Sequence, residues 1–528
     1  MNRERPLTSE LGGSGQIEHT ESTARPCPTD ALRQTLTIPV SLMIKSKWKV
    51  GMLVLATPIL VVLLIVFTRA AMMKPETFSV APTTPTTLDD SGAIQRFAGA
   101  IRIATVSEAG KPPNPAVMLS FRNYFQQNFP RVHATMKREV LPDGALLFTW
   151  EGSDPTKLPV ILMGHMDVVP AFQWKHGPFS GDIAEGSIWG RGTIDDKIQV
   201  LASLEAAESL IAAGFTPAHT ILFAFGCDEE NGGAFGAQKI VKLLQSRGVR
   251  AEFVLDEGGF VVSHVIPGLE RPIALIGTAE KGYVDFTLTT KGKAGHSSSP
   301  PPHTAIGQLS TALSKLENNQ APASMPEGVR QQFETLEPYL PFAPRLVLAN
   351  LWLFKPLVIA FGARSPEFAN SFRTTIAETM FNSGFKENAL PAEARAVINF
   401  RILPGETADT VAERIRKTVN DPGVTIANNN SEGTRNPSPI SPTTSTGYQT
   451  LATTIRQLFP DAIVCPFLLT AATDSSYYYV LSPNVYRFLA VEGDAAILTM
   501  MHGANEHIST DSYIKAVAFY AQLIRNIP

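Results

Sequence analysis

Cysteine is scarce in this chain, with only Cys27, Cys227 and Cys465 among 528 residues. Three widely spaced thiols make neither a disulfide framework nor a cysteine-type zinc site. The net charge is only −3, so the composition gives no reason to expect a nucleic-acid partner. With 44% hydrophobic and 18% charged residues, the chain has the balance of an ordinary globular protein, and its length allows two or three domains.

One long apolar run, "VGMLVLATPILVVLLIVFT", lies near the N-terminus and predicts a transmembrane signal-anchor over residues 49–69. Three lysines precede it, so the positive-inside rule places residues 1–48 in the cytoplasm and everything after the anchor on the exoplasmic or periplasmic side. Residues 1–48 are polar and without periodicity, so we expect them to be disordered. Residues 70–92 are rich in Pro and Thr and are expected to form an extended stalk. A cleaved signal peptide, which would make the protein secreted, stays open, as does a start at Met43.

Strand-like and helix-like patterns alternate between residues 93 and 280. "LPVILMGHMDVV" and "HTILFAFGCDEE" are apolar runs that end in polar residues, and "IDDKIQVLASLEAAESLIAAG" between them has the pattern of a helix. This alternation predicts an α/β catalytic domain with a mixed sheet flanked by helices. Because ligands bind at the carboxyl ends of strands in open α/β sheets, we expect the polar residues there to converge.

The pattern changes after residue 281. "KGYVDFTLTTKG" alternates like a half-exposed strand, and further helix and strand patterns follow it. They predict an inserted α+β lid domain of ferredoxin-like type over residues 281–430, after which the catalytic domain resumes over 431–528. The stretch "ANLWLFKPLVIAFG" inside this lid is unusually apolar, and it either packs in the core or lines a channel for an acyl chain.

Five clusters of acidic residues and histidines carry the candidate chemistry. They are found in "GHMDVVP", "WGRGTIDDK", "CDEENGG", "LDEGG" and "MHGANEHIS". Carboxylates with two histidines and no thiolate suit zinc, cobalt or manganese. One acidic pair at a strand end is usually only a solvated loop, but five clusters in this α/β context favour a site for paired metal ions. His165 and Asp167 share one strand face, so the carboxylate is placed to orient a ligand histidine.

From about residue 95 onward, the chain resembles the di-zinc metallopeptidase family of carboxypeptidase S, aminoacylase and glutamate carboxypeptidase. Besides the five clusters, "GTAEKGYVDFTL", "AGHSSSPPPHTAIGQL" and "HGANEHIS" resemble the branch of carboxypeptidase S and N-fatty-acyl-amino-acid synthase/hydrolase. The resemblance implies a zinc-dependent hydrolase of an amide bond, peptide or N-acyl, next to a C-terminal amino acid with a free carboxylate. It implies two Zn²⁺ ions, with Co²⁺ or Mn²⁺ as substitutes. An N-fatty-acyl-amino-acid hydrolase/synthase and a short-chain aminoacylase stay open as alternatives, and so does the oligomeric state.

The resemblance also implies a role for each residue that matches the motifs. The metal ligands would be His165 and Asp256 on one zinc, Glu230 and His502 on the other, and Asp195 bridging both. The catalytic residues would be Asp167, which orients His165; Glu229, the general base; and His296, which reaches the oxyanion from the lid. Asn388 and Arg401 would contact the substrate, and the guanidinium of Arg401 suits a terminal carboxylate. A cis peptide bond between Asp195 and Asp196 is implied as well. A non-catalytic relative would lack some of these ligands, and none is missing.

Overall fold

The structure, a computed structural model, describes residues 40–108, 110–365, 368–428, 433–494 and 496–528. It divides into two units, Met1–Leu64 and Ile65–Pro528, which we treat separately. Most of the segment predicted to be disordered lies outside the described residues, although helix α1 already begins within it, spanning Val40–Met72. Among the residues whose side chains are described, no single helix has the length and apolar character needed to cross a membrane, and Ala56–Met72 is a shorter apolar helix. The transmembrane anchor therefore stays a prediction.

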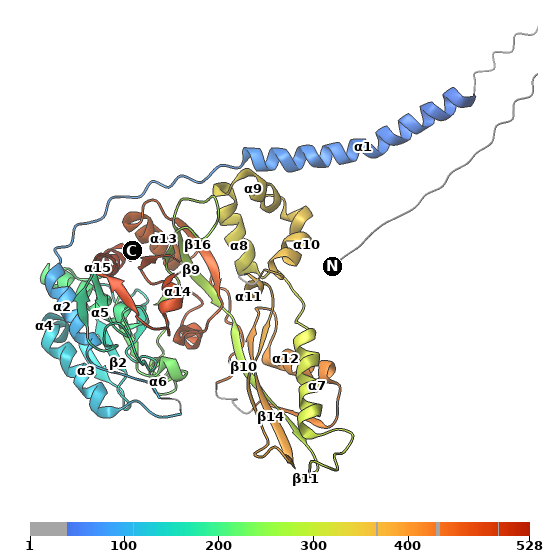
Figure 1. The fold of residues 1–528 in the computed structure, drawn as a ribbon. Helices are drawn as coiled ribbons and strands as arrows, with labels where there is room; N and C mark the ends of the chain where they lie inside the picture. Colours follow the sequence, from blue (N-terminus) through green and yellow to red (C-terminus); the bar gives the residue numbers. More distant parts are fainter. Residues whose placement is uncertain (1–39, 109, 366–367, 429–432, 495) are drawn as a thin grey trace, which may run out of the picture. The chain divides into compact units, whose positions relative to one another are not determined.

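The second unit is built on a ten-stranded mixed sheet (Figure 1). Its order is β1 (Lys137–Val140), β2 (Leu146–Trp150), β6 (Ile221–Gly226), β3 (Val160–His165), β7 (Val254–Asp256), β17 (Val485–Arg487), β9 (Ile273–Glu280), β8 (Val261–Val262) and β18 (Glu492–Gly493), with β16 (Ile463–Leu469) beside β9. Strand β3 is parallel to β6 and β7, whereas β2 is antiparallel to β1 and β6. Strands β3 and β6 are buried along their whole length, which explains their continuous apolar runs.

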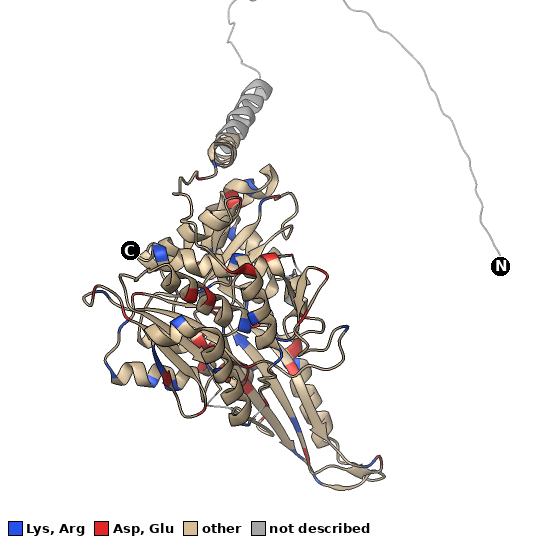
Figure 2. Cartoon of the chain, turned by 90° about the vertical axis from the view of Figure 1, so that its left-hand side faces the viewer, with Lys and Arg blue, Asp and Glu red and all other residues tan. Residues whose placement is uncertain are grey.

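Helices flank this sheet, as the sequence predicts. Helix α5 (Lys197–Ala212) packs on β3, and α2 (Asp90–Ile101), α4 (Pro130–Thr135) and α15 (Thr510–Asn526) pack against α5. The remaining helices of this part are α3 (Pro115–Asn128), α6 (Ala237–Ser246), α13 (Thr446–Leu458) and α14 (Ala496–Met500). A separate small sheet joins β19 (His507–Ser509), β5 (Ser187–Trp189) and β4 (Asp182–Ala184). In the view of Figure 2, Lys and Arg are interspersed with Asp and Glu along the ribbon of this unit.

The lid has its own sheet and core. Along the chain it runs β10 (Gly282–Lys291), α7 (Ala305–Asn318), β12 (Thr375–Ser383), β14 (Glu393–Ile402), α12 (Ala408–Val419) and β15 (Val424–Ala427), and the sheet order is β12-β14-β10-β15. Neighbouring strands are antiparallel, and α7 and α12 pack on the sheet. This is the βαββαβ arrangement of a ferredoxin-like domain. Strands β11 (Gly295–His296) and β13 (Ala389–Leu390) form its tip, at the end farthest from the catalytic sheet in Figure 1.

A helical insertion interrupts the lid between α7 and β12, and the sequence patterns do not predict it. It contains α8 (Glu327–Leu336), α9 (Phe342–Leu348), α10 (Leu351–Gly362) and α11 (Ala369–Phe372). Helix α8 packs on β16, a strand of the catalytic sheet, and so does not belong to the lid core. The apolar stretch predicted to pack or to line a channel is α10. One of its faces packs in a small core through Val358 and Ile359, while Leu357 and Phe361 on the other are 60% and 73% exposed.

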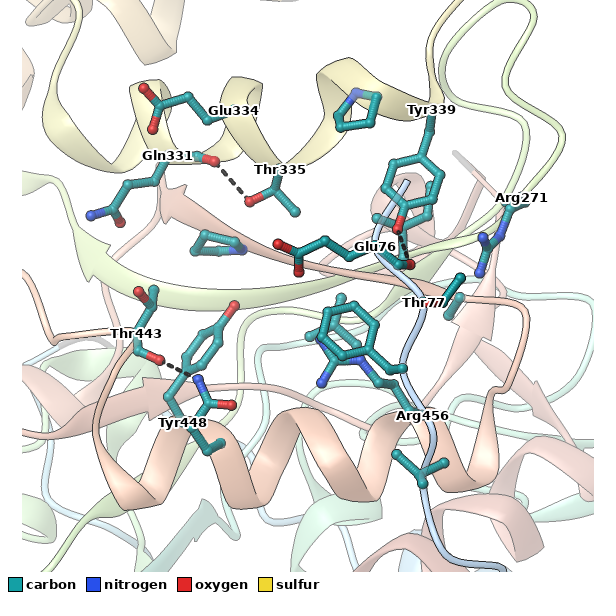
Figure 3. Close-up of a pocket in the computed structure, with 18 of the residues that line it drawn as sticks. Glu76, Thr77, Arg271, Gln331, Glu334, Thr335, Tyr339, Thr443, Tyr448 and Arg456 are labelled. Carbon is teal, nitrogen blue, oxygen red and sulfur yellow. Dashed lines mark hydrogen bonds between the residues drawn. The ribbon is translucent and has the colours of Figure 1, made fainter. Parts of the chain in front are cut away.

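The predicted stalk is extended, because residues 73–89 form neither helix nor strand, but it is not a free spacer. Gln457 donates a hydrogen bond to the carbonyl oxygen of Ala81 at 2.9 Å, and the guanidinium of Arg456 lies 3.5 Å from the ring centre of Phe78. Residues 74–80 cross a cavity of about 750 Å³ between α8 and α13, where Figure 3 shows Glu76 and Thr77. No predicted site residue lines this cavity.

Candidate metal centre and active site

The candidate site forms where strands of the catalytic sheet end. His165 is the last residue of β3, and Glu229 and Glu230 begin the short 3-10 helix after β6 (η1, Glu229–Asn231). Asp195 precedes helix α5, and the peptide bond between it and Asp196 is cis, as the resemblance implies. His502 follows α14 with a φ of 58°, in a backbone region that side chains rarely adopt. Residues far apart in the sequence thus meet at one edge of the sheet, as expected.

The carboxylate of Asp195 lies between the two histidines. Its Oδ1 is 3.0 Å from Nε2 of His165, and its Oδ2 is 3.0 Å from Nε2 of His502. Each oxygen therefore faces a different imidazole, which is the geometry that a carboxylate bridging two metal ions requires. His165 is buried, whereas the side chain of His502 is 58% exposed, so the site is open on the His502 side.

Two further carboxylates complete the two halves of this cluster. Oε2 of Glu230 is 3.1 Å from Nε2 of His502, and Oε1 of Glu257 is 3.4 Å from Nε2 of His165. Candidate ligand atoms lie within 4.8 Å of one another in two groups: His165 with Asp195 and Glu230, and His165 with Asp196 and Glu257. Oε1 of Glu230 and Oδ1 of Asp196 are buried and accept no hydrogen bond from the described residues. Unpaired buried carboxylate oxygens beside two imidazoles are what a cation site provides, so these residues fit divalent metal ions.

The predicted ligand Asp256 is not in either group, and Glu257 takes its place. Both are buried at the end of β7, but successive side chains of a strand point to opposite sides. The backbone N–H of Ser475 donates to Oδ2 of Asp256 at 2.9 Å, so this carboxylate is already engaged. The geometry favours Glu257 over Asp256 as the ligand beside His165, because Oε1 of Glu257 faces that ring.

Asp167 has a wider role than orienting His165. Nδ1 of His165 lies 3.0 Å from the backbone carbonyl oxygen of Asp167 and 3.4 Å from its carboxylate, so both groups hold the ring. The same carboxylate accepts hydrogen bonds from the backbone N–H groups of Glu229 at 3.1 Å and Glu230 at 3.2 Å. The hydroxyl of Ser107 donates to it at 2.7 Å. Asp167 therefore links the ligand histidine to the loop that carries the predicted base.

Glu506 is a positioning residue within the motif "HGANEHIS", and the motif alone does not indicate its role. Its Oε1 accepts hydrogen bonds from the backbone N–H groups of Gly192, Ile194 and Asp195 at 3.1, 2.7 and 3.2 Å. Its Oε2 accepts one from Arg191 at 2.5 Å, and both side chains are almost fully buried. Glu506 thus ties the His502 loop to the loop that presents Asp195.

The electrostatics of the cluster call for positive charge. Burial raises the pKa of Glu229, and burial with the neighbouring Asp195 raises the pKa of Glu257 to about 8. Hydrogen bonds that His502 donates to the carboxylates of Asp195 and Glu230 raise its pKa to about 10. Without metal, the carboxylates compete for protons with one another and hold the histidine protonated. Bound cations would relieve this repulsion, since they favour ionised carboxylates and neutral imidazole.

The structure does not bring the predicted lid residues to this cluster. His296 is exposed at the lid tip, where its Nδ1 lies 2.8 Å from the hydroxyl of Ser298. Asn388 lies beside it, because its carbonyl oxygen accepts a hydrogen bond from the backbone N–H of Ser297 at 3.1 Å. Arg401 lies at the other end of the lid sheet, opposite Tyr283, with its guanidinium 4.8 Å from that ring centre. His296 and Asn388 therefore lie at one end of the lid domain, and Arg401 lies at the other.

Another arginine, Arg435, interacts electrostatically with Glu229 of the cluster. No pattern in the sequence predicts a role for it. Arg435 pairs with Tyr283 through a β-bridge and donates to the carbonyl oxygen of Thr473 at 3.2 Å. Burial lowers the pKa of Arg435, but the neighbouring Tyr477, Asp474 and Glu229 raise it by more. Arg435 lies in the polar loop "GTRNPSP", which has no periodicity that would predict its place near the cluster.

Comparison with known proteins agrees with this geometry. Residues 161–526 match the family described as "Peptidase family M20/M25/M40". The chain is 39% identical to the "Probable carboxypeptidase S-like 2" of Dictyostelium discoideum, over 84% of this chain and 86% of that protein. It is 40% identical to the "N-fatty-acyl-amino acid synthase/hydrolase PM20D1" of Xenopus tropicalis, over 82% and 85%. The family resemblance predicted from the motifs is confirmed.

Among solved structures, the fold is similar to an M20 family metallo-carboxypeptidase, Sso-CP2, from Sulfolobus solfataricus. The TM-score is 0.62 at 17% sequence identity, and the match covers 83% of this chain and 99% of that one. At this identity the likeness concerns the fold alone. The predicted α/β fold with a mixed sheet flanked by helices is confirmed.

Proposed function

Because the chain belongs to the M20/M25/M40 peptidase family, whose members depend on metal, we propose that it hydrolyses an amide bond next to a C-terminal amino acid with a free carboxylate. The observation that carries this proposal is the Asp195 carboxylate, with its two oxygens each 3.0 Å from a different histidine and the Glu229 loop beside it. The relatives named carboxypeptidase S-like and N-fatty-acyl-amino acid synthase/hydrolase support the same class of reaction.

We assign the metals to two sites that share Asp195. His165 and Glu257 would hold one ion, and His502 and Glu230 the other. Imidazole and carboxylate ligands without thiolate suit Zn²⁺, with Co²⁺ or Mn²⁺ as substitutes. When bound, two such ions would polarise the substrate carbonyl and lower the pKa of the attacking water. Metal analysis of the purified protein tests the assignment, and a chain without tightly bound metal would contradict it.

The side chains of this chain supply proton transfer and positioning. Glu229 would accept the proton of the attacking water and then donate it to the nitrogen of the leaving amine. Asp167 fixes the base through the backbone N–H of Glu229, at 3.1 Å. His296 would donate a hydrogen bond to the oxyanion, for which either the lid must move or a second copy must supply its lid tip.

Recognition of the free carboxylate is the proposed task of Arg401. Its planar guanidinium can hold a carboxylate through two hydrogen bonds. The test compares hydrolysis of an N-acyl amino acid with that of its carboxamide. Arg401→Ala should lower kcat/KM for the acid and hardly change it for the amide. Equal rates of the unaltered enzyme on both compounds would remove the carboxylate from recognition.

Preference for the acyl group of the substrate distinguishes the carboxypeptidase from the two alternative enzymes. A carboxypeptidase prefers blocked dipeptides, an N-fatty-acyl-amino-acid hydrolase/synthase prefers long acyl chains, and a short-chain aminoacylase prefers acetyl. The relative named N-fatty-acyl-amino acid synthase/hydrolase supports the second possibility. A series of substrates that share one amino acid and differ only in the acyl group separates all three.

We also propose that the protein is a single-pass membrane protein with its catalytic domain on the exoplasmic or periplasmic side. The apolar run over residues 49–69 and the lysines before it support this orientation. Protease added to cells or spheroplasts whose outer face of the anchored membrane is accessible should remove the catalytic domain. Complete protection of the domain until the cells are permeabilised would contradict the orientation.

A further inference from the structure

An exposed apolar surface lies on the helical insertion, away from the metal cluster. Helices α9 and α10 expose Phe342, Trp352, Leu353, Leu357 and Phe361 by 41–73%. Gly362 is the only fully buried residue of α10, although the inner face of this helix contacts the small core. Isolated exposed apolar residues are normal, but a cluster of this kind usually marks a contact with a partner or a membrane.

This surface, which we call the α9–α10 surface, is continuous with the end of helix α1. The ring centres of Phe67 and Phe342 are 6.1 Å apart. The side chain of Asn350 donates a hydrogen bond to the carbonyl oxygen of Val66 at 3.0 Å, and Arg69 donates to that of Ala349 at 3.1 Å. Because Val66 and Phe67 belong to the last residues of the apolar run, the end of that run lies beside the α9–α10 surface.

The stalk contacts the helical insertion soon after helix α1 ends. Tyr339, three residues before α9, donates a hydrogen bond to the carbonyl oxygen of Glu76 at 3.5 Å, as Figure 3 shows. The stalk therefore holds the catalytic body next to the end of α1 from residue 76 onward. A free stalk of the same length would leave the body away from any membrane in which the apolar run is inserted.

We propose that the α9–α10 surface lies in the interfacial layer of a lipid bilayer. The chemistry fits this layer, since Trp352 is an aromatic residue of the kind enriched there and Lys355 and Arg364 are exposed cations beside the apolar side chains. Helix α10 alone is too short to cross a bilayer, and α9 and α10 together have the length and composition of a span only as a bent pair. Helix α10 has 12 residues, about 18 Å against a hydrocarbon core of about 30 Å, and α9 leaves it at 108°.

The membrane contact differs from the proposed anchor and from the proposed reaction. It predicts that the catalytic body is fixed against the lipid surface by two elements, α1 and the α9–α10 surface, which are remote in sequence. The enzyme could lack this contact and still hydrolyse its substrate, because no ligand of the metal cluster belongs to α9 or α10.

The test places an environment-sensitive fluorophore on the full chain mixed with vesicles of phosphatidylcholine and phosphatidylserine. The fluorophore is attached to the cysteine of Leu357→Cys. In the matched control it is attached to the cysteine of Phe385→Cys, because Phe385 is 87% exposed in the loop between β12 and β13. Both variants also carry Cys27→Ser, and the two native cysteines in the described part of the chain are buried and should stay unlabelled. Lipids with a quencher near the headgroup should remove most of the emission from position 357 and leave that from position 385 unchanged.

Three results would overturn the proposal. The chain could fail to bind the vesicles, the reporter at position 357 could emit as in water, or its emission could be shifted to the blue and yet resist the lipid quencher, which would indicate a protein occupant such as a second copy. A second variant, Leu357→Asp with Phe361→Asp, separates structure from binding. It should keep its melting temperature in detergent and its hydrolytic rate, and a reporter at Leu353→Cys in that background should lose its quenching.

Discussion

Replacing Glu229 by glutamine separates proton transfer from metal binding. The carboxylate of Glu229 belongs to neither group of candidate ligand atoms, and its backbone N–H, not its side chain, is held by Asp167 at 3.1 Å. Glutamine has the same shape, so the loop and the bound metal should be unchanged. Because burial raises the pKa of Glu229, loss of its charge also removes a cost to the folded state, and the melting temperature should not fall.

The size of the effect follows from the step that is lost. A positioned general base contributes roughly 10²–10⁴-fold to the rate, which corresponds to about 2.7–5.4 kcal/mol of activation free energy. We therefore expect kcat for Glu229→Gln to fall by about that factor while KM and the metal content stay near those of the unaltered enzyme. Steady-state kinetics on one N-acyl amino acid, with metal analysis of the same preparation, measures both quantities.

The neighbouring Glu230→Gln is the matched control. It differs by one position but removes an oxygen 3.1 Å from His502, so it should lower both the rate and the metal content. If Glu229→Gln retains a kcat within a factor of about ten of the unaltered enzyme, Glu229 is not the base. If it loses metal as Glu230→Gln does, then its side chain is a ligand and the assignment of the cluster is wrong.

Three other predictions address the cluster and the fold. Glu257→Gln should lose metal on dialysis whereas Asp256→Asn keeps it, and the reverse order would restore the sequence-based ligand. Glu506→Gln leaves Arg191 buried without its partner, which costs about 3–5 kcal/mol, so its melting temperature and metal content should both fall; unchanged values would refute the coupling of the two loops. Burial raises the pKa of Glu337 from 4.5 to about 7, so the folded chain keeps a proton that the unfolded chain loses, and stability should fall as pH rises through that window. Glu337→Gln should flatten the pH dependence of the melting temperature, and a slope equal to that of the unaltered protein would contradict this.

The sequence predicts the parts of the site that follow from strand ends. Apolar runs define β3 and β6, and the polar residues that follow them must meet at one edge of a parallel sheet. The family resemblance assigned Asp256, but a sequence pattern does not show which of two adjacent carboxylates, Asp256 or Glu257, points into the site. That choice depends on Ser475, whose backbone N–H occupies Asp256 from more than 200 residues away in the sequence.

The helical insertion could not be predicted from the sequence for a different reason. Apolar periodicity shows that a segment has a face to bury, but not which layer it packs against. Helix α8 packs on β16 of the catalytic sheet, although its sequence lies inside the lid. The apolar α10 keeps one side exposed, and no pattern in "LWLFKPLVIAFG" distinguishes that side from a buried one.

The bond network of Glu506 has a consequence for synthesis of the protein. Asp195 emerges from the ribosome some 300 residues before His502 and Glu506, and its loop lacks both its second imidazole and its backbone acceptor until they arrive. A nascent chain, or a product that stops before residue 502, would thus carry most of the hydrolytic residues in an inert form. Competence would appear only when the loop of His502 and Glu506 folds onto the loop of Asp195.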